Sequence, residues 1–470
     1  MILLKRYELA TLTPEVRLAL NGNGLMKKLS LILVCVFAMY SNVYAASSKV
    51  KNVQYLLNQL GFNAGKEDGL YGNTTKKALI AFYESQGRLF DGSINQNEIS
   101  DLILEKSKFK PTKNQITFPN YYYTKEMKSC EAMEIKSFKG SYSVKKVESL
   151  IGYDWPTDHD QNSNSRDVKH QNITEPIKTF LQASHNAITE NDEASIAIAT
   201  KLLVKIAEAN TLYDSIGYIA VKEKPQCYAN GDYKSKCWYH QYEFARGVFS
   251  NYMIAALWLR ARLAPDEYDV VDRYINKMYD KFLRPIELKK QDQGLYQMAN
   301  GGLSILIYAS WMNNKELAAE EIHFRFKELN RLIFSDGYID NNSFRGVRSQ
   351  WYHSYGLNIA LGYVYIADLW GAQTPETLHY KLVNASKIAN LAITNWQKFK
   401  SREFTGQNRN ALKGKEHAIK HTHQMAISID KLMLIVTGIK LETDPVYLKK
   451  REYHAKDGID DLIGFNANCI

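Results

Sequence analysis

The residues best suited to chemistry lie in one short segment, 345–355. It contains, in order, Arg345, Arg348, Trp351, Tyr352, His353 and Tyr355. If a helix begins near Ser349 and the preceding turn is helix-like, the arginines and tyrosines fall at helical spacings on one face. An arginine beside a tyrosine favours the phenolate and lowers the pKa of the phenol from about 10. This pattern favours removal of a proton next to a carboxylate that the arginine neutralises. The alternative is a helix start with solvated arginines and an aromatic stripe in the core.

Two other clusters precede helical patterns and carry similar groups. The first includes Gln297 and Asn300 and leads into an apolar run that reaches Trp311. The second includes His240 and Arg246 and begins another long apolar run. Polar side chains and free amides at helix starts favour anions. Three such starts in one domain therefore predict a groove for an anionic ligand, and capping with core packing is the alternative for each.

The elements that must position these clusters are helices. From residue 173 onward, apolar residues recur at three-four spacing, and alternating strand patterns are scarce. The predicted helical runs are 194–209, 242–263, 269–282, 302–312, 317–334, 351–369, 377–396 and 423–436. Helices of this number and length predict an all-α fold, an incomplete α/α toroid over residues 141–470, with loops at one end lining a groove.

A smaller unit precedes this domain at residues 46–104. An amphipathic helix ends at Gly61, a tight turn follows at 68–72, and Thr74 or Thr75 caps a second helix. A third turn and helix complete the unit. Its Leu-Leu-x-x-Leu-Gly-Phe and Asp-Gly-x-Tyr-Gly-x-x-Thr patterns resemble the small three-helix peptidoglycan-binding domain of bacterial cell-wall enzymes. The resemblance implies peptidoglycan as a partner of residues 50–102, and a generic three-helix spacer is the alternative.

The segment that joins the two units is predicted to be a linker, residues 105–140. It begins with a charged stretch from Glu105 to Lys113. A self-contained unit followed by a charged linker predicts a module that folds alone. On this hypothesis, removal of the module leaves the activity of the larger domain on a soluble polymer intact.

The amino terminus has the pattern of a secretory signal. Met26-Lys27-Lys28 is a basic start, residues 29–39 are apolar, and Val43-Tyr44-Ala45 is a small-residue cleavage site. We therefore expect residues 1–45 to be an upstream extension and signal peptide. The mature protein is predicted to be periplasmic or secreted, and association with the cell wall is a further expectation.

Export makes disulfides possible, and four cysteines follow the signal: Cys130, Cys227, Cys237 and Cys469. Cys227 and Cys237 flank a turn and are the natural local pair, with free buried thiols as the alternative. No Cys/His spacing resembles a zinc site, so no metal is predicted.

The charge balance limits the classes of molecule that the protein is expected to bind. The 470 residues carry 60 Lys+Arg against 50 Asp+Glu, a formal net charge of +10, with 31 Tyr and 7 Trp. A basic, aromatic-rich chain fits nucleic acid, an anionic membrane surface or an acidic polysaccharide. No zinc-finger, basic-zipper or RNA-binding signature accompanies the charge, so nucleic acid is not an expected partner.

The helical domain resembles the alginate lyase family of polysaccharide lyases, whose members have an α/α toroid. The resemblance runs from about residue 175 to 440, and its most specific element is Arg345 followed seven residues later by Tyr352-His353. It implies that Arg345 and Asn300 neutralise the uronate carboxylate and that Tyr352 moves protons, without a cofactor. The family's asparagine is followed by a histidine, whereas Gly301 follows Asn300 here. This departure puts a histidine-based step in doubt.

The same chemistry follows from the residues. β-Elimination removes the C5 proton of a 4-linked uronate and breaks its C4–O bond, which requires a neutralised carboxylate and a stabilised enolate. One tyrosine serves as both base and acid only if proton and leaving group lie on one face of the sugar, as in D-mannuronate and D-glucuronate. The sequence therefore predicts a lyase for a D-uronate polymer (mannuronate-rich alginate or a glucuronate polymer). Its expected substrate-binding residues are Arg348, His240, Arg246, Trp351, His353 and Gln297.

Two alternatives stay open. The amino-terminal unit favours a glycosidase or lyase that acts on peptidoglycan, although glycosidases need two opposed carboxylates and no acidic pair stands out. The departure at Gly301 favours an inactive polysaccharide-binding protein.

Overall fold

The computed structural model describes residues 46–128, 137–154, 170–213, 248–284, 295–340, 342–344, 349–400 and 429–442, together with residues 463, 465, 467 and 470. Those parts of the chain contain fourteen α-helices and no β-strand, with an isolated β-bridge between Ile333 and Ile339. The predicted all-α fold is therefore confirmed. No helix within these ranges is long and apolar enough to cross a membrane. The predicted signal segment 1–45 and the predicted pair Cys227 and Cys237 lie outside the described residues.

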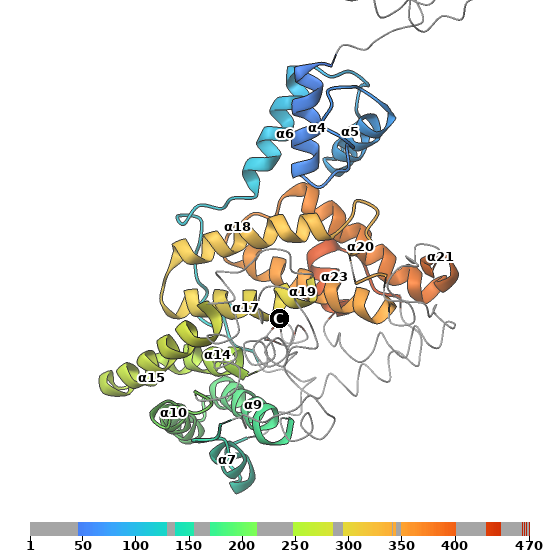
Figure 1. Ribbon diagram of the computed structural model, residues 1–470. Coiled ribbons are helices and arrows are strands. Elements are labelled where there is room, and N and C mark those ends of the chain that lie inside the picture. The colour runs from blue at the N-terminus through green and yellow to red at the C-terminus, as the bar shows by residue number, and fades with distance from the viewer. Residues whose placement is uncertain are drawn as a thin grey trace, which may run out of the picture.

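The amino-terminal domain is a three-helix unit. Its helices are α4 (Ser48–Gln59), α5 (Asn73–Ser85) and α6 (Gln96–Lys108) (Figure 1). They close around buried apolar side chains that recur at helical spacing, among them Val53, Leu57, Phe62, Leu79, Phe82 and Leu102. α4 ends as predicted, because Gly61 adopts φ +76° and turns the chain out of the helix.

A buried glutamine organises the turn between α4 and α5. The Gln54 amide nitrogen lies 3.1 Å from the Asp68 carboxylate, the Leu70 carbonyl oxygen and the Thr75 hydroxyl. Thr75 is therefore a core residue and not the predicted cap. Gly72 occupies the N-cap position of α5 and makes no side-chain cap. The Asp-Gly-x-Tyr-Gly-x-x-Thr pattern thus encodes partners for one buried amide, which must be hydrogen-bonded to be stable in the core.

The helical domain begins at α7 and contains the remaining helices. They are α7 (Ser141–Glu148), α9 (Glu175–Thr189), α10 (Glu193–Glu208), α14 (Ser250–Leu259), α15 (Pro265–Met278), α17 (Leu295–Trp311), α18 (Lys315–Leu332), α19 (Ser349–Leu369), α20 (Glu376–Thr394), α21 (Trp396–Lys400) and α23 (Ile429–Thr437). Short π-helical turns precede α9 and follow α15, at His170–Thr174 and Tyr279–Leu283. These helices cover most of the predicted runs.

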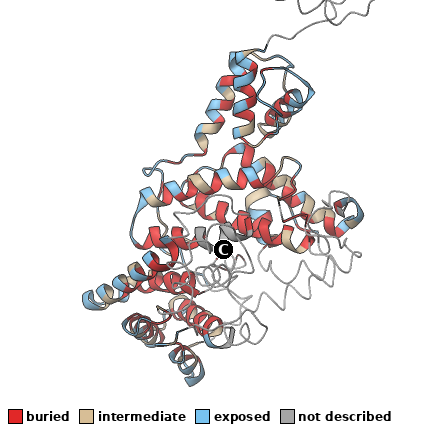
Figure 2. Cartoon of the chain, viewed as in Figure 1, coloured by how far each residue is buried: buried red, intermediate tan, exposed pale blue. Residues whose placement is uncertain are grey.

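Successive helices alternate between two layers. In one layer α9 packs on α14, α14 on α17, α17 on α19, and α19 on α23. In the other layer α10 packs on α15, and α18 packs on α20. Figure 2 shows α14, α17 and α19 buried along most of their described length, whereas α7, α10 and α15 expose one side. The finer prediction of an incomplete α/α toroid remains a prediction.

The segment after α6 is not a free linker. α6 continues to Lys108, beyond the predicted boundary at residue 105, and residues 109–123, here called the strap, pack on the helical domain. Three consecutive strap carbonyls, of residues 121, 122 and 123, accept hydrogen bonds from Trp258, Trp370 and Tyr365 at 3.2, 3.0 and 3.0 Å. The charged start of the segment gave the expectation of a linker, but the buried aromatic side chains further along it determine where it packs.

Candidate functional site

The predicted start of the candidate helix agrees with the structure, in which α19 runs from Ser349. Tyr352 is half-buried there, and its ring meets the Trp351 ring edge-on with centroids 4.3 Å apart. Tyr355 is fully buried, so the two predicted tyrosines differ in their access to a ligand. Arg345 and Arg348 lie outside the described residues. Tyr352 is therefore the predicted catalytic residue whose surroundings the structure describes.

The turn before α19 fixes the helix start. Asn342 donates its side-chain amide to the Tyr352 carbonyl oxygen at 2.8 Å. The Ser343 hydroxyl accepts a hydrogen bond from the Ile339 amide at 2.7 Å. The first contact joins the turn at residues 342–344 to the first turn of α19, and the second closes the turn on itself.

His353 is a core residue, and its expected role as a substrate ligand needs correction. Its side chain is fully buried, with Nε2 donating to the Ala385 carbonyl oxygen at 2.9 Å. A neutral ring that donates from Nε2 must accept at Nδ1, so the Ser343 hydroxyl, 2.8 Å away, is the donor there. Burial lowers the pKa of His353 to about 4. Both nitrogens are thus used inside the protein, and we assign His353 no contact with substrate.

The first turns of α17 adjoin α19 next to Tyr352. Gly356, one turn after Tyr352, lies so close to α17 that a Cβ added there would meet the Leu295 side chain at 2.9 Å. Gln297 and Asn300 follow Leu295 on α17. Their backbone therefore belongs to the helix that crosses α19 near the candidate tyrosine. The other predicted ligands, His240 and Arg246, lie outside the described residues.

A second set of polar residues joins the amino-terminal domain to α18 and α20. Lys381 of α20 is fully buried, and its ammonium lies 3.1 Å from the Gly61 carbonyl oxygen and 2.5 Å from that of Asn330. Asn330 of α18 donates its amide to the Leu60 carbonyl oxygen. Residues of the other domain thus donate hydrogen bonds to the carbonyl groups at the end of α4. These bonds are needed because a buried carbonyl without a partner is unfavourable.

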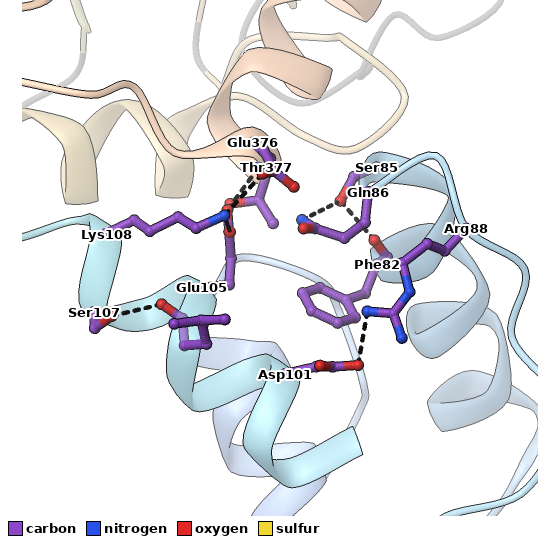
Figure 3. A network of polar contacts seen from close by, with 11 residues as sticks. Phe82, Ser85, Gln86, Arg88, Asp101, Glu105, Ser107, Lys108, Glu376 and Thr377 are labelled. Atoms are coloured by element: carbon purple, nitrogen blue, oxygen red, sulfur yellow. Dashed lines mark hydrogen bonds and ion pairs between the residues drawn. The ribbon is translucent and has the colours of Figure 1, made fainter. Parts of the chain in front are cut away.

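The end of α6 makes the matching contact. The Glu105 carboxylate accepts a hydrogen bond from the Thr377 amide, in the first turn of α20, at 2.8 Å. Lys108 bridges Glu105 at 3.0 Å and Glu376 at 2.8 Å (Figure 3). A carboxylate at a helix start satisfies a free amide and favours the helix dipole. One domain therefore caps a helix of the other.

The sequence did not predict that Glu105, Asn330 and Lys381 form an interface between the two domains. Glu105 and Thr377 are 272 positions apart in the chain, and no local spacing relates them. The sequence predicted that α4 ends at Gly61, but it did not predict which residues bind the carbonyl groups at that helix end.

Comparison with protein families gives one match. Residues 46–99 match the family model described as "Putative peptidoglycan binding domain". Neither the curated proteins nor the solved structures yielded a match to the chain. The match covers α4, α5 and the start of α6, and it agrees with the resemblance inferred from the sequence. The chain thus carries an amino-terminal peptidoglycan-binding domain at residues 46–99.

Proposed function

We propose that this protein binds peptidoglycan through residues 46–99 and holds its helical domain in a fixed orientation on the cell wall. The family match supports the ligand. The observation that supports the fixed orientation is the buried interface, in which Lys381, Asn330 and Glu105 make charge-assisted or buried hydrogen bonds between the domains. Such bonds are costly to break without replacement. Localisation outside the cytoplasm follows from this ligand as part of the same proposal.

Sedimentation with purified sacculi tests the proposal. The chain beginning at residue 46 should co-sediment with sacculi in a saturable manner, and digestion of the sacculi with a muramidase should release it. An unrelated protein of similar positive charge serves as the control, because non-specific attraction to anionic polymers depends on charge alone. Enrichment no greater than that of the control would refute wall binding.

As a second candidate function we propose that the helical domain cleaves a D-uronate polymer by β-elimination. The observation that favours it is a half-buried phenol, Tyr352, at the start of α19, beside the helix that carries Gln297 and Asn300. In this mechanism Tyr352 takes the C5 proton and returns a proton to the leaving O4. Arg345 and Asn300 neutralise the carboxylate and stabilise the enolate, each by up to a few kcal/mol.

Ultraviolet absorbance of new C4–C5 double bonds tests the lyase. The protein is mixed with polymannuronate, polyguluronate, polyglucuronate and peptidoglycan, and absorbance and reducing ends are followed together. Growth of both on a D-uronate polymer supports the lyase. Reducing ends without absorbance support a glycosidase, and no product from any polymer supports a binding protein.

Substitution of Tyr352 by Phe separates catalysis from packing. Tyr352→Phe retains the ring that contacts Trp351 but removes the hydroxyl, so turnover should fall at least about a thousandfold while polymer binding is retained. Arg345→Lys should also lower the rate, because lysine lacks the planar fork that grips a carboxylate. A fully active Tyr352→Phe protein would eliminate this mechanism.

A further inference from the structure

The three helices of the amino-terminal domain meet the helical domain at one end. Leu60 at the end of α4 contacts α18, and Lys108 at the end of α6 contacts the first residue of α20. α5 also packs on α20, and Figure 3 places Ser85 and Gln86, at its end, beside that contact. The carboxyl-terminal ends of all three helices therefore face the helical domain, and their amino-terminal ends point away from it (Figure 1).

The opposite end of this domain, here called the outer end, is formed by the helix starts and the loops 68–72 and 91–95. Two hydrogen bonds join these parts. The Ser47 amide donates to the Gly69 carbonyl oxygen at 2.9 Å, and the Tyr71 hydroxyl donates to that of Gly92 at 3.3 Å. These two contacts hold the parts of the outer end together, and among the described residues the hydrogen bonds and ion pairs to the helical domain come from the opposite end.

This surface combines positive charge with exposed apolar side chains. Its exposed lysines include Lys49, Lys51, Lys76 and Lys77, and its carboxylates are Asp68, Asp91 and the buried Glu98 at the start of α6. Asp68 and Asp91 accept hydrogen bonds from their own turns, which lower the pKa values of both. The first turns of α4 and α5 contain no acidic residue, so the positive ends of both helix dipoles are not neutralised there. Leu70 and Tyr71 are 43% and 37% exposed among these charges.

We propose that the outer end is the face that binds peptidoglycan. Its lysines pair with carboxylates of the stem peptides, and Leu70 and Tyr71 pack against the apolar faces of the sugars or the peptide. The inference rests on the proposed wall binding, and it adds which face binds. Charge complementarity supports it, because peptidoglycan is anionic. The end that faces the helical domain, here called the docked end, is excluded as the binding face, since residues of α18 and α20 already bind its polar groups.

Two outer-end variants and two matched controls test this face by sedimentation with sacculi. The first variant is Tyr71→Ala, and its control is Tyr55→Ala, a tyrosine of the same domain that is 42% exposed on the side of α4. The second variant combines Lys49→Gln with Lys76→Gln. Its control combines Lys145→Gln with Lys201→Gln, which remove the same charge from exposed positions of the helical domain.

The outer-end variants should each raise the apparent Kd for sacculi by about tenfold or more, as expected for contacts within an interface. The lysine pair should lose its effect at high salt, because exposed ion pairs are screened. Both controls should stay within about twofold of the parent chain. Melting curves show whether each variant is folded. If Tyr71→Ala unfolds the domain, the double variant Lys49→Gln with Lys76→Gln still tests the proposed face.

The outcomes distinguish this inference from the function on which it rests. If the parent chain fails to bind sacculi, the proposed function and the inference fall together. If the parent chain binds and the outer-end variants bind equally well, the wall is bound elsewhere and only the inference is overturned. Equal losses in variants and controls would also overturn it, because such losses indicate a general charge effect.

Discussion

The docked end of the amino-terminal domain and the start of α19 both bury polar side chains, but the groups that they satisfy differ. At the docked end, Lys381 and Asn330 bind backbone carbonyls of another domain. At the start of α19, His353 binds Ser343 and Ala385 of its own domain. The first set fixes two domains together, and the second fixes a turn beside the candidate tyrosine.

This difference separates residues that a ligand can reach from residues that the protein itself uses. His353 has no free nitrogen, whereas its neighbour Tyr352 is half-buried at the same helix start. Likewise, the ends of α4 and α6 are covered, whereas Leu70 and Tyr71 at the opposite end are exposed. In both regions the buried polar contacts hold the scaffold, and the side chains that we propose for recognition (Tyr352 in one, Leu70 and Tyr71 in the other) are less buried.

Deletion of residues 46–104 should have the largest effect on stability. The deletion exposes the buried Lys381 and removes most of α6, the helix that carries Glu105. The helical domain should therefore lose several kcal/mol of unfolding free energy, or fail to fold. Calorimetry against the chain that begins at residue 46 measures the change. An unchanged melting temperature would restore the hypothesis of an independent module followed by a charged linker.

Lys381 should make stability depend on pH. Burial lowers its pKa from 10.5 to about 7, so between these values the unfolded chain binds a proton that the folded protein does not. The free energy of unfolding should therefore increase as the pH rises from about 7 to 10.5 and decrease as the pH is lowered through the same range. At a slope of up to about 1.4 kcal/mol per pH unit, the change from pH 7 to 10 is at most about 4 kcal/mol.

Lys381→Met isolates this contribution, because methionine fills similar space without titrating. The difference in unfolding free energy between parent and variant, from urea titrations at pH 7, 8.5 and 10, should grow in favour of the parent as pH rises. Parallel pH profiles would show that Lys381 is not desolvated at the interface.

His353→Ala should cost roughly 3 kcal/mol of unfolding free energy, because it leaves a cavity and removes the partners of Ser343 and Ala385. Tyr352→Phe is the matched neighbour and should cost less than about 1 kcal/mol, since the ring and its contact with Trp351 are retained. Denaturant midpoints of both variants give the comparison. The opposite order of cost would mean that His353, and not Tyr352, faces the ligand.

Glu105→Ala should cost less than His353→Ala, about 1–2 kcal/mol, the usual cost of losing a helix cap. The change removes the acceptor for the Thr377 amide and one of the two carboxylates that contact Lys108. Glu84→Ala is the control, because Glu84 is exposed on α5. Thermal unfolding of both variants measures the difference, and equal melting temperatures would contradict a capping role across the interface.

Most of the helices could be predicted from the sequence, since amphipathic spacing is a local property of the chain. The start of α19 at Ser349 and the end of α4 at Gly61 both agree with the structure. The prediction that Thr74 or Thr75 caps α5 was wrong, since Gly72 holds the N-cap position and Thr75 binds Gln54, which precedes it by 21 positions. The linker was misjudged because its charged start gave no sign that its later aromatic residues pack on the helical domain.

The sequence by itself determined the helical elements and the identity of the peptidoglycan-binding domain, because both depend on short spacings along one segment. The tertiary structure alone decided how the remaining polar residues are used. It buried His353 between Ser343 and Ala385, and it brought Glu105 to Thr377 across 272 positions. The physical reason is that a buried polar group requires a partner, and that partner is chosen by packing in three dimensions and not by proximity in the chain.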